Sequence, residues 1–223
     1  MAGIVSTGPH LVRYGPDAFQ RLVDLVAEVK ADDIFAPVTV AVPSPYAGLS
    51  LRRQLAATAG IVNVRFMVSS RVAEYLGSPR LVINGKSPLS PLLEMAAIRS
   101  VGSEMVGTGP LGTIAEHPRL HASLSSSFRN LDRLTKEQLD KVGTADPLRD
   151  QMVAWRERTL DLVSGHYSRE ELLWSAAAAV QDGSAAPALR DLGFVIFYLP
   201  EDMSPAETSL VKSLAKVGLC SVI

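Results

Sequence analysis

The chain has 223 residues, of which 47% are hydrophobic and 20% are charged, which is ordinary for a globular protein with a sizeable core. A net charge of -1 excludes an overall basic field that would attract nucleic acid or membranes, although a local basic face is compatible with it. The single cysteine, Cys220, excludes a disulfide framework and is expected to be an inert core thiol. With no signal peptide and no apolar run near the ~20 residues that span a bilayer, we expect a cytoplasmic protein without a membrane partner.

Strand and helix patterns alternate in the first part of the chain. Apolar runs predict strands at residues 2–7, 38–42 and 62–68, because parallel strands buried on both faces are continuously hydrophobic. Asp17 is expected to cap a first helix. The predicted helices span 18–30, 47–59 and a segment from Ser69 or Ser70 to Tyr75. This alternation indicates a doubly wound parallel sheet.

The periodicity becomes helical from about residue 87 to 182, with no convincing strand. Helices are predicted there at 90–106, 118–131, 135–142, 147–164 and 168–180. A buried strand follows at 194–199, then a helix from a Ser204 cap to Lys216, and a final strand at 217–223. We therefore predict an α/β fold in which an all-helical insertion interrupts a three-layer core. The predicted parts are 1–86 (first part of the core), 87–182 (insertion) and 183–223 (return to the core).

The end of the chain is apolar. Residues 217–223 have no polar tail, whereas domains usually end in a solvated segment. We expect a fragment of a longer polypeptide that continues from the edge of the sheet.

A phosphate-binding loop would follow the first strand, at residues 6–15. Such a loop needs glycines, a lysine for the β- and γ-phosphates and a Ser or Thr for magnesium. The first lysine is Lys30, and Pro9 removes an amide donor. Three residues mark this degenerate nucleotide loop: Gly8, His10 and Arg13. We expect that nucleotide binding is lost, and a variant nucleotide site around Gly8 is the alternative.

Other catalytic and metal-binding patterns are weak. Glu201 and Asp202 follow Pro200, too late to be strand-end magnesium ligands, and are expected to form a solvated turn. His117 and His121 have metal-ligand spacing but lack a third ligand, so solvated or capping histidines are expected. We predict no catalytic residue, no metal and no cofactor in this chain.

Hydroxyl and basic side chains follow the second and third predicted strands. Ligands of open α/β sheets approach the carboxyl ends of the strands, where hydroxyls reach phosphates and an aromatic ring stacks on a base. The candidate DNA-binding residues are Ser44, Tyr46, Arg52, Arg53, Ser69, Ser70 and Arg71. The alternative is that Arg52 and Arg53 only solvate a helix face. In the insertion, Arg119, Arg129 and Arg133 are expected to form an ordinary polar face.

A family pattern extends over most of the chain. Its segments are Val42-Pro43-Ser44-Pro45-Tyr46, Leu51-Arg52-Arg53, Val62-Asn63-Val64-Arg65-Phe66 with Ser69-Ser70-Arg71, Pro88-Leu89-Ser90-Pro91, Phe128-Arg129-Asn130-Leu131, Tyr167 with Glu170-Glu171-Leu172-Leu173, and Phe194 to Pro200 followed by Ser204-Pro205-Ala206-Glu207. Together these segments resemble the N-terminal helicase-like region of AddB-type proteins, the B subunits of the AddAB helicase–nuclease, also described as RecB-family exonuclease or PD-(D/E)XK nuclease proteins.

The resemblance implies a superfamily-one helicase fold, that is, a P-loop NTPase-like, RecA-like parallel-sheet core with an inserted helical subdomain. Residues 44–53 and 66–71 would then occupy the motif Ia and Ib positions, which face single-stranded DNA. Many members retain the phosphate loop, and this chain departs from them there. The family's nuclease lies in a C-terminal domain that this chain lacks.

The implied function is a catalytically inactive helicase-like module of a DNA repair or recombination helicase–nuclease that binds or guides single-stranded DNA. Its parent would be an ATP-dependent exonuclease subunit, with a helicase motor subunit or the C-terminal nuclease domain of the same polypeptide as partner. Two alternatives stay open. One is a protein-interaction scaffold without DNA affinity, and the other is a nucleotide-dependent enzyme with an unusual loop at residues 8–15.

Overall fold

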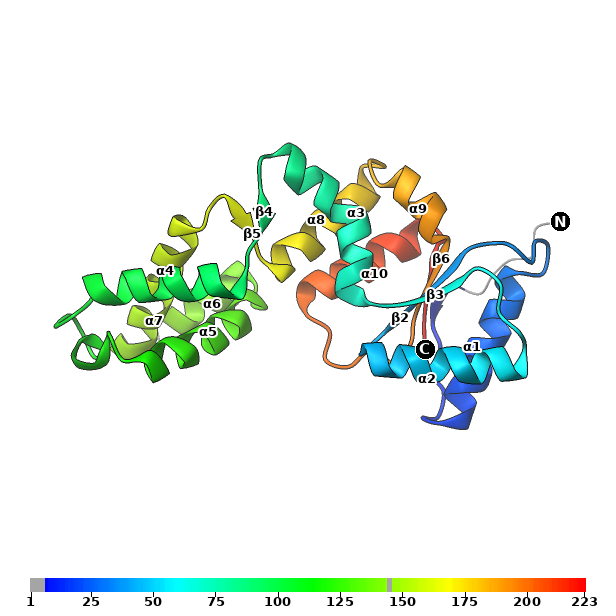
Figure 1. The fold of residues 1–223 in the computed structure, drawn as a ribbon, viewed down its shortest axis with the longest axis horizontal. Coiled ribbons are helices and arrows are strands. Elements are labelled where there is room, and N and C mark those ends of the chain that lie inside the picture. The colour runs from blue at the N-terminus through cyan, green and yellow to red at the C-terminus, as the bar shows by residue number, and fades with distance from the viewer. Residues whose placement is uncertain (1–6, 144–145) are drawn as a thin grey trace. The chain divides into compact units, whose positions relative to one another are not determined.

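The computed structural model describes residues 7–143 and 146–223. Contacts divide the chain into two compact units: unit 1 is the chain up to Arg80 together with Glu171–Ile223, and unit 2 is Leu81–Glu170 (Figure 1). The strand predicted at residues 2–7 lies, apart from Thr7, outside the described residues. The predicted insertion, 87–182, begins later than unit 2 and ends in a helix that the contacts group mainly with unit 1.

Unit 1 contains a five-stranded sheet, and all of its strand pairs are parallel. In sheet order the strands are β1 (Gly8–Pro9), β7 (Cys220–Val222), β6 (Phe194–Phe197), β2 (Val38–Val42) and β3 (Val64–Val68). Continuous apolar runs predicted β2 and β6 as buried parallel strands, and both are buried along their whole length. The prediction of an α/β fold with a parallel sheet is confirmed.

Helices cover the two faces of this sheet. They are α1 (Pro16–Val29), α2 (Pro45–Thr58), α3 (Ser69–Ile83), α8 (Arg169–Gln181), α9 (Ala186–Leu192) and α10 (Pro205–Lys216). One face of β2, formed by Val38, Val40 and Val42, packs in a single core with α1 and α2. The chain moves in one direction along the sheet through β1, β2 and β3, and in the other from β6 to β7. Right-handed crossovers therefore place α10 on the face opposite α1 and α2.

Several local expectations differ from the structure. Gly15, not Asp17, is the N-cap of α1, because Pro16 at the first helical position starts the helix earlier. Helix α3 continues to Ile83 instead of ending at Tyr75, although it contains Gly77 and Pro79. The final strand, β7, lies between β1 and β6, so the expected position of this strand at the edge of the sheet is wrong.

Unit 2 is formed mainly by helices: α4 (Pro91–Glu104), a 3₁₀ turn (Gly112–Ile114), α5 (Pro118–Asp132), α6 (Lys136–Gly143) and α7 (Pro147–Leu162). Their core surrounds Trp155, whose indole N–H donates to the Ile98 carbonyl at 3.1 Å. A parallel ladder joins β4 (Ser87–Pro88) to β5 (His166–Tyr167). The expectation of a strand-free segment is therefore wrong, because two-residue strands are too short to produce a periodicity.

Candidate functional site

The sheet of unit 1 has a topological switch point between β2 and β6. These strands are neighbours, but β2 continues through α2 towards β3, whereas β6 continues through α10 towards β7. The two connections diverge at the carboxyl ends of the strands, and open α/β sheets bind ligands in the crevice that such a divergence leaves. Ser44 follows β2 at this place, and Leu199, with a left-handed backbone (φ 46°), follows β6.

Ser44 and Tyr46 begin α2 at this edge. The Ala47 amide donates to the Ser44 hydroxyl oxygen at 3.2 Å, so Ser44 is the N-cap and Pro45 takes the first helical position. The cap uses the oxygen and leaves the hydroxyl proton able to donate. Tyr46 is 86% exposed. This edge therefore presents a hydroxyl donor beside an accessible aromatic ring.

Ser69, Ser70 and Arg71 follow the neighbouring strand, β3. The pairing of Val42 with Val68 brings them to the same edge as Ser44. Arg71 forms an ion pair with Glu74, and its guanidinium lies 5.8 Å from the centre of the Tyr75 ring. Because the Arg71 side chain is 60% exposed, this pair holds it only weakly, and the guanidinium can also reach an external anion.

Ser69 has a structural partner that the sequence did not indicate. Its hydroxyl donates to Glu207 Oε1 at 2.8 Å, and Glu207 Oε2 accepts from the Ser204 amide at 3.1 Å. Glu207 is buried at the third position of α10 and completes a capping box with Ser204, the cap that the sequence predicted. The Ser69 proton is therefore used to join β3 to α10.

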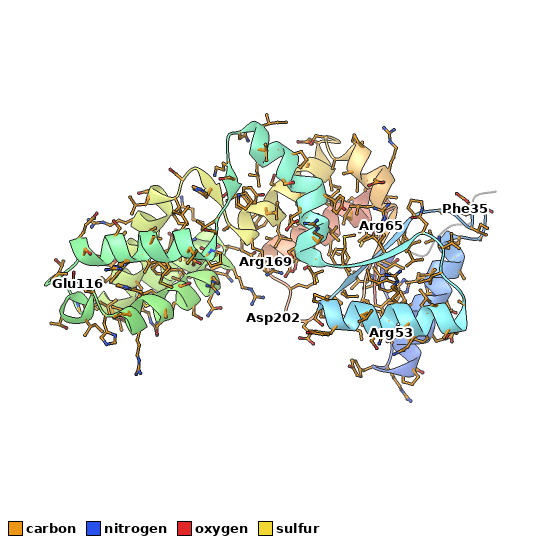
Figure 2. The ribbon with its side chains drawn as sticks, viewed as in Figure 1. Phe35, Arg53, Arg65, Glu116, Arg169 and Asp202 are labelled. Carbon is orange, nitrogen blue, oxygen red and sulfur yellow. The ribbon has the colours of Figure 1, made fainter. Side chains whose placement is uncertain are left out.

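Arg52 and Arg53 lie further along α2. They are seven and eight residues after Pro45, about 10–12 Å along the helix axis. Arg53 is labelled midway along the helix in Figure 2. Both are exposed, and neither has a hydrogen-bond or ion-pair partner among residues 7–143 and 146–223. The structure thus brings Ser44, Tyr46, Ser69, Ser70 and Arg71 to one edge and leaves these two arginines outside that group.

A solvent-facing stripe of α2 connects the two sets. The buried face of α2 is formed by Gly48, Leu51 and Leu55. Tyr46 and Arg53 are seven residues apart and project away from that face, with the half-exposed Leu49 between them. Leu49 was not among the predicted site residues, because a leucine in a helix usually indicates a core position.

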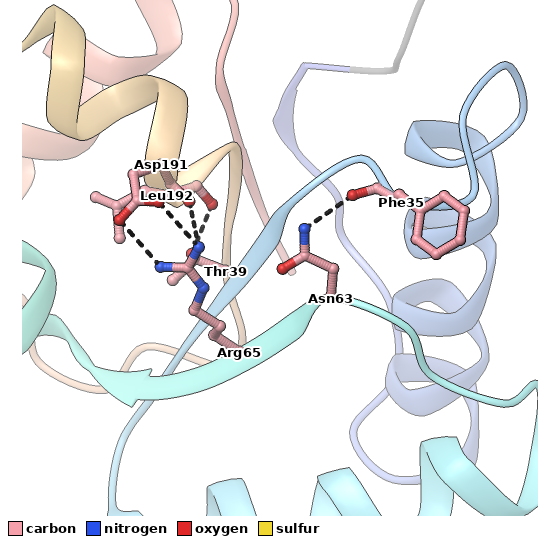
Figure 3. Close-up of polar contacts among 6 residues, drawn as sticks. All are labelled: Phe35, Thr39, Asn63, Arg65, Asp191 and Leu192. Atoms are coloured by element: carbon pink, nitrogen blue, oxygen red, sulfur yellow. Dashed lines mark hydrogen bonds and ion pairs between the residues drawn. The ribbon is translucent and has the colours of Figure 1, made fainter.

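Arg65 lies near the amino end of β3 and has a structural role (Figure 3). Its guanidinium donates to the Asp191 carbonyl at 2.6 Å and lies 3.4 Å from the Asp191 carboxylate. Beside it, the buried Thr39 hydroxyl donates to the Leu192 carbonyl at 2.7 Å. Both side chains donate hydrogen bonds to backbone carbonyls at the carboxyl end of α9, where the positive charge of Arg65 also interacts favourably with the helix dipole. Arg65 therefore does not belong to the candidate site.

The degenerate nucleotide loop connects β1 to α1. The His10 amide donates to the Val222 carbonyl at 2.7 Å, and Gly8 has φ 118°. Arg13 is exposed, and the N-cap of α1 is Gly15, which has no side chain that could accept a hydrogen bond from the helix amides. Since Pro16 also lacks an N–H, the helix start offers few amide donors for a phosphate. A strand, a loop and a helix follow one another here, but the loop lacks the lysine that a phosphate-binding loop requires.

The acidic residues after β6 and the histidines of unit 2 lie outside the candidate site. Glu201 and Asp202 are exposed in the turn before α10, as expected. His117 caps α5 by accepting from the Arg119 amide at 3.2 Å, which confirms a capping histidine. His121 was expected to be solvated or to cap a helix, and the solvated alternative is wrong. It is buried beside Trp155, with its Nε2 2.7 Å from the Ala115 carbonyl oxygen.

Across residues 7–143 and 146–223, no three His, Cys, Asp or Glu side chains are grouped so that they could hold a metal ion. Within the same ranges, every helix is too short or too polar to span a bilayer.

Comparison with known proteins does not identify a function for this site. No protein-family model matches the chain, and no curated protein matches it.

Proposed function

We propose that unit 1 is a catalytically inactive helicase-like module that binds or guides single-stranded DNA at the carboxyl edge of its sheet. One observation supports this most directly: a free hydroxyl donor, an exposed tyrosine and an exposed arginine lie together where β2 and β3 end, beside the switch point. These are the groups Ser44, Tyr46 and Arg71.

Each group has a role that the chemistry of a DNA strand requires. Arg71 and the Ser44 hydroxyl can bind phosphate oxygens, and Tyr46 can stack on a base. Arg53 extends this surface along α2, on the same stripe as Tyr46. Phosphate contacts and stacking do not discriminate between bases, so the proposed binding has little sequence preference.

The finer fold assignment is part of the proposal. The five-stranded parallel sheet is compatible with a RecA-like core, and the sequence resemblance favours the superfamily-one helicase type with unit 2 as its helical insertion. Without a lysine in the β1–α1 loop, ATP hydrolysis would belong to a partner. The parent protein would be a subunit of a cytoplasmic ATP-dependent exonuclease, acting in DNA repair or recombination with a motor subunit or a C-terminal nuclease domain.

The test is fluorescence anisotropy of a labelled single-stranded oligonucleotide, titrated with the chain at several salt concentrations. The test variant replaces Arg52, Arg53 and Arg71 with alanine. Each lost phosphate contact on a single strand lowers the slope of log affinity against log salt by about 0.7, so three contacts lower it by about 2.

A matched control removes the same charge elsewhere in unit 1. Arg190, Lys212 and Lys216 are exposed on α9 and α10, and none adjoins the ends of β2 or β3. Replacing these three with alanine should leave affinity and salt slope nearly unchanged. Unchanged binding in the test variant, or an equal loss in the control, would contradict the assignment of the site.

A scaffold without DNA affinity is the second candidate. Leu11 and Tyr14 are 101% and 85% exposed in the β1–α1 loop, where a nucleotide hydrolase would hold phosphate. Exposed apolar side chains at such a place favour a protein partner. Absence of oligonucleotide binding even at low salt would support this candidate, and thermal stabilisation by magnesium nucleotide would instead support a nucleotide-dependent enzyme.

A further inference from the structure

Unit 2 contains a cavity of about 330 Å³ at the carboxyl ends of its two short strands. The Leu89 amide donates to the Tyr167 carbonyl at 3.0 Å and extends the ladder to the cavity wall. Beyond the ladder the two strands lead into α4 and α8, so the first turns of both helices contribute to the lining. Three segments that are far apart in sequence (89–94, 129–133 and 168–170) meet here.

Three arginines line this cavity. Arg129 and Arg133 come from the end of α5, and Arg169 is the first residue of α8 (labelled in Figure 2). The sequence predicted an ordinary polar face for Arg129, Arg133 and Arg119. The structure separates them, because Arg119 is exposed at the other end of α5, whereas the other two line the cavity.

The acidic residues of the cavity wall are largely neutralised by internal partners. Asp132 accepts from Arg156 Nε at 2.8 Å and Nη2 at 2.6 Å, and Arg156, which does not line the cavity, is only 14% exposed. Glu94 accepts from the Ser125 hydroxyl at 3.2 Å and lies 3.6 Å from Arg129 Nη2.

The remaining acidic residue, Glu170, lies 3.8 Å from Arg169. The wall itself has three arginines and three carboxylates, and Arg156 adds a fourth guanidinium behind Asp132, so these seven side chains together have a charge of +1. Arg129 Nη2 also donates to the Ser125 hydroxyl oxygen at 2.8 Å, so Ser125 links this arginine to Glu94.

We propose that this cavity binds the phosphate group of a ligand. Arginine donates two parallel N–H groups to phosphate oxygens, and the positive end of the α8 dipole favours an anion beside Ser168 and Arg169. Leu89 and Pro91 provide an apolar wall for the uncharged part of the ligand. The volume lies at the lower end of the range for small-molecule sites and suits a phosphomonoester.

The experiment is isothermal titration calorimetry of the full chain with inorganic phosphate, ribose 5-phosphate and an oligothymidylate that has a 5′-hydroxyl. The variant Arg129→Gln should weaken phosphate binding about tenfold, the expected effect of losing a hydrogen bond to a charged group. Arg119→Gln, which removes the same charge from the same helix, should bind as the original chain does. Since the Arg129 side chain is 64% exposed, its substitution leaves the core intact, which a melting curve checks.

A second variant predicts the opposite sign. Glu94→Gln keeps an acceptor for Ser125 but removes the negative charge beside Arg129, so phosphate should bind more tightly. Weaker binding by this variant, equal losses in the Arg119 and Arg129 variants, or no binding of any probe would overturn the proposal. Binding of oligothymidylate alone, lost in Arg129→Gln, would keep the phosphate chemistry and identify a strand backbone as its source. These residues belong to unit 2, so the outcome is independent of the three-arginine test on unit 1.

Discussion

Replacing Gly193 with alanine should separate the start of β6 from the segment that precedes β2. Gly193 follows α9 with φ 67° and ψ -144°, a conformation that is essentially restricted to glycine. A Cβ atom there would lie 1.9 Å from the Pro37 carbonyl oxygen and 2.5 Å from its carbonyl carbon. The same oxygen accepts from the Phe194 amide at 3.1 Å, so relieving the clash also breaks the first hydrogen bond between these segments.

The expected cost has two parts. The backbone conformation costs about 1–3 kcal/mol for a residue with a side chain. A buried amide left without its acceptor costs about 1–3 kcal/mol more. We therefore expect Gly193→Ala to lower the free energy of unfolding of unit 1 by about 2–6 kcal/mol.

Gly183→Ala provides the matched control. Gly183 also has a left-handed backbone (φ 79°), but an added Cβ there would have no atom within 4 Å. The Gly183→Ala substitution should lower the free energy of unfolding by only ~1–2 kcal/mol, the cost of a left-handed backbone for a residue with a side chain. Urea unfolding followed by circular dichroism compares the two variants, and hydrogen exchange locates the effect, with protection expected to fall in β6 and to persist in α5 and α7. Equal destabilisation by the two substitutions would refute the reasoning.

Two further predictions concern buried groups of unit 1. Glu207→Gln leaves one carbonyl oxygen for the two donors Ser69 and Ser204. This substitution should therefore lower the midpoint of urea unfolding by the equivalent of about 1–3 kcal/mol. The control Glu201→Gln, at an exposed position, should change the midpoint little. Burial raises the pKa of the Cys220 thiol to about 12, so it should react with a disulfide reagent at pH 8 only after denaturation. An unfolded thiol ionises near pH 8.5, so between that pH and about 12 the folded state binds more protons than the unfolded state. The contribution of the Cys220 thiol to stability should therefore be lost as the pH rises from about 8.5 to about 12. Rapid reaction of the native thiol would contradict the buried position of Cys220.

Local signals explain what was predicted correctly. Ser204 precedes a proline that begins a helix, and it is the N-cap that was predicted. Ser44 has the same pattern and is also an N-cap, a role that was not predicted for it. The apolar runs at β2 and β6 predicted buried parallel strands because they are continuous. The candidate site could be predicted in part for the same reason, since residues that directly follow neighbouring parallel strands must share one edge of the sheet.

Other features depend on partners that are distant in sequence. Gly77 was expected to lie beyond the end of a helix, but its missing side chain allows close packing on the backbone of Leu172 and Ala176 in α8, and the Ser175 hydroxyl donates to its carbonyl at 2.9 Å. The structural role of Arg65 depends on its hydrogen bond to the carbonyl of Asp191, which is 126 residues away in sequence. No local pattern indicates either contact.

The sequence by itself determined the α/β class, most of the helices and buried strands, and the absence of a lysine from residues 6–15. Periodicity, caps and residue types act within a few residues of the chain, which is why these features could be predicted. The tertiary structure alone decided the strand order and the switch point between β2 and β6. It also decided which hydroxyls and arginines are available: Ser69 is taken by Glu207, Ser44 can still donate, and Arg129 lines a cavity while Arg119 does not. The reason is physical, since a side chain's availability depends on the groups that folding brings within hydrogen-bond distance.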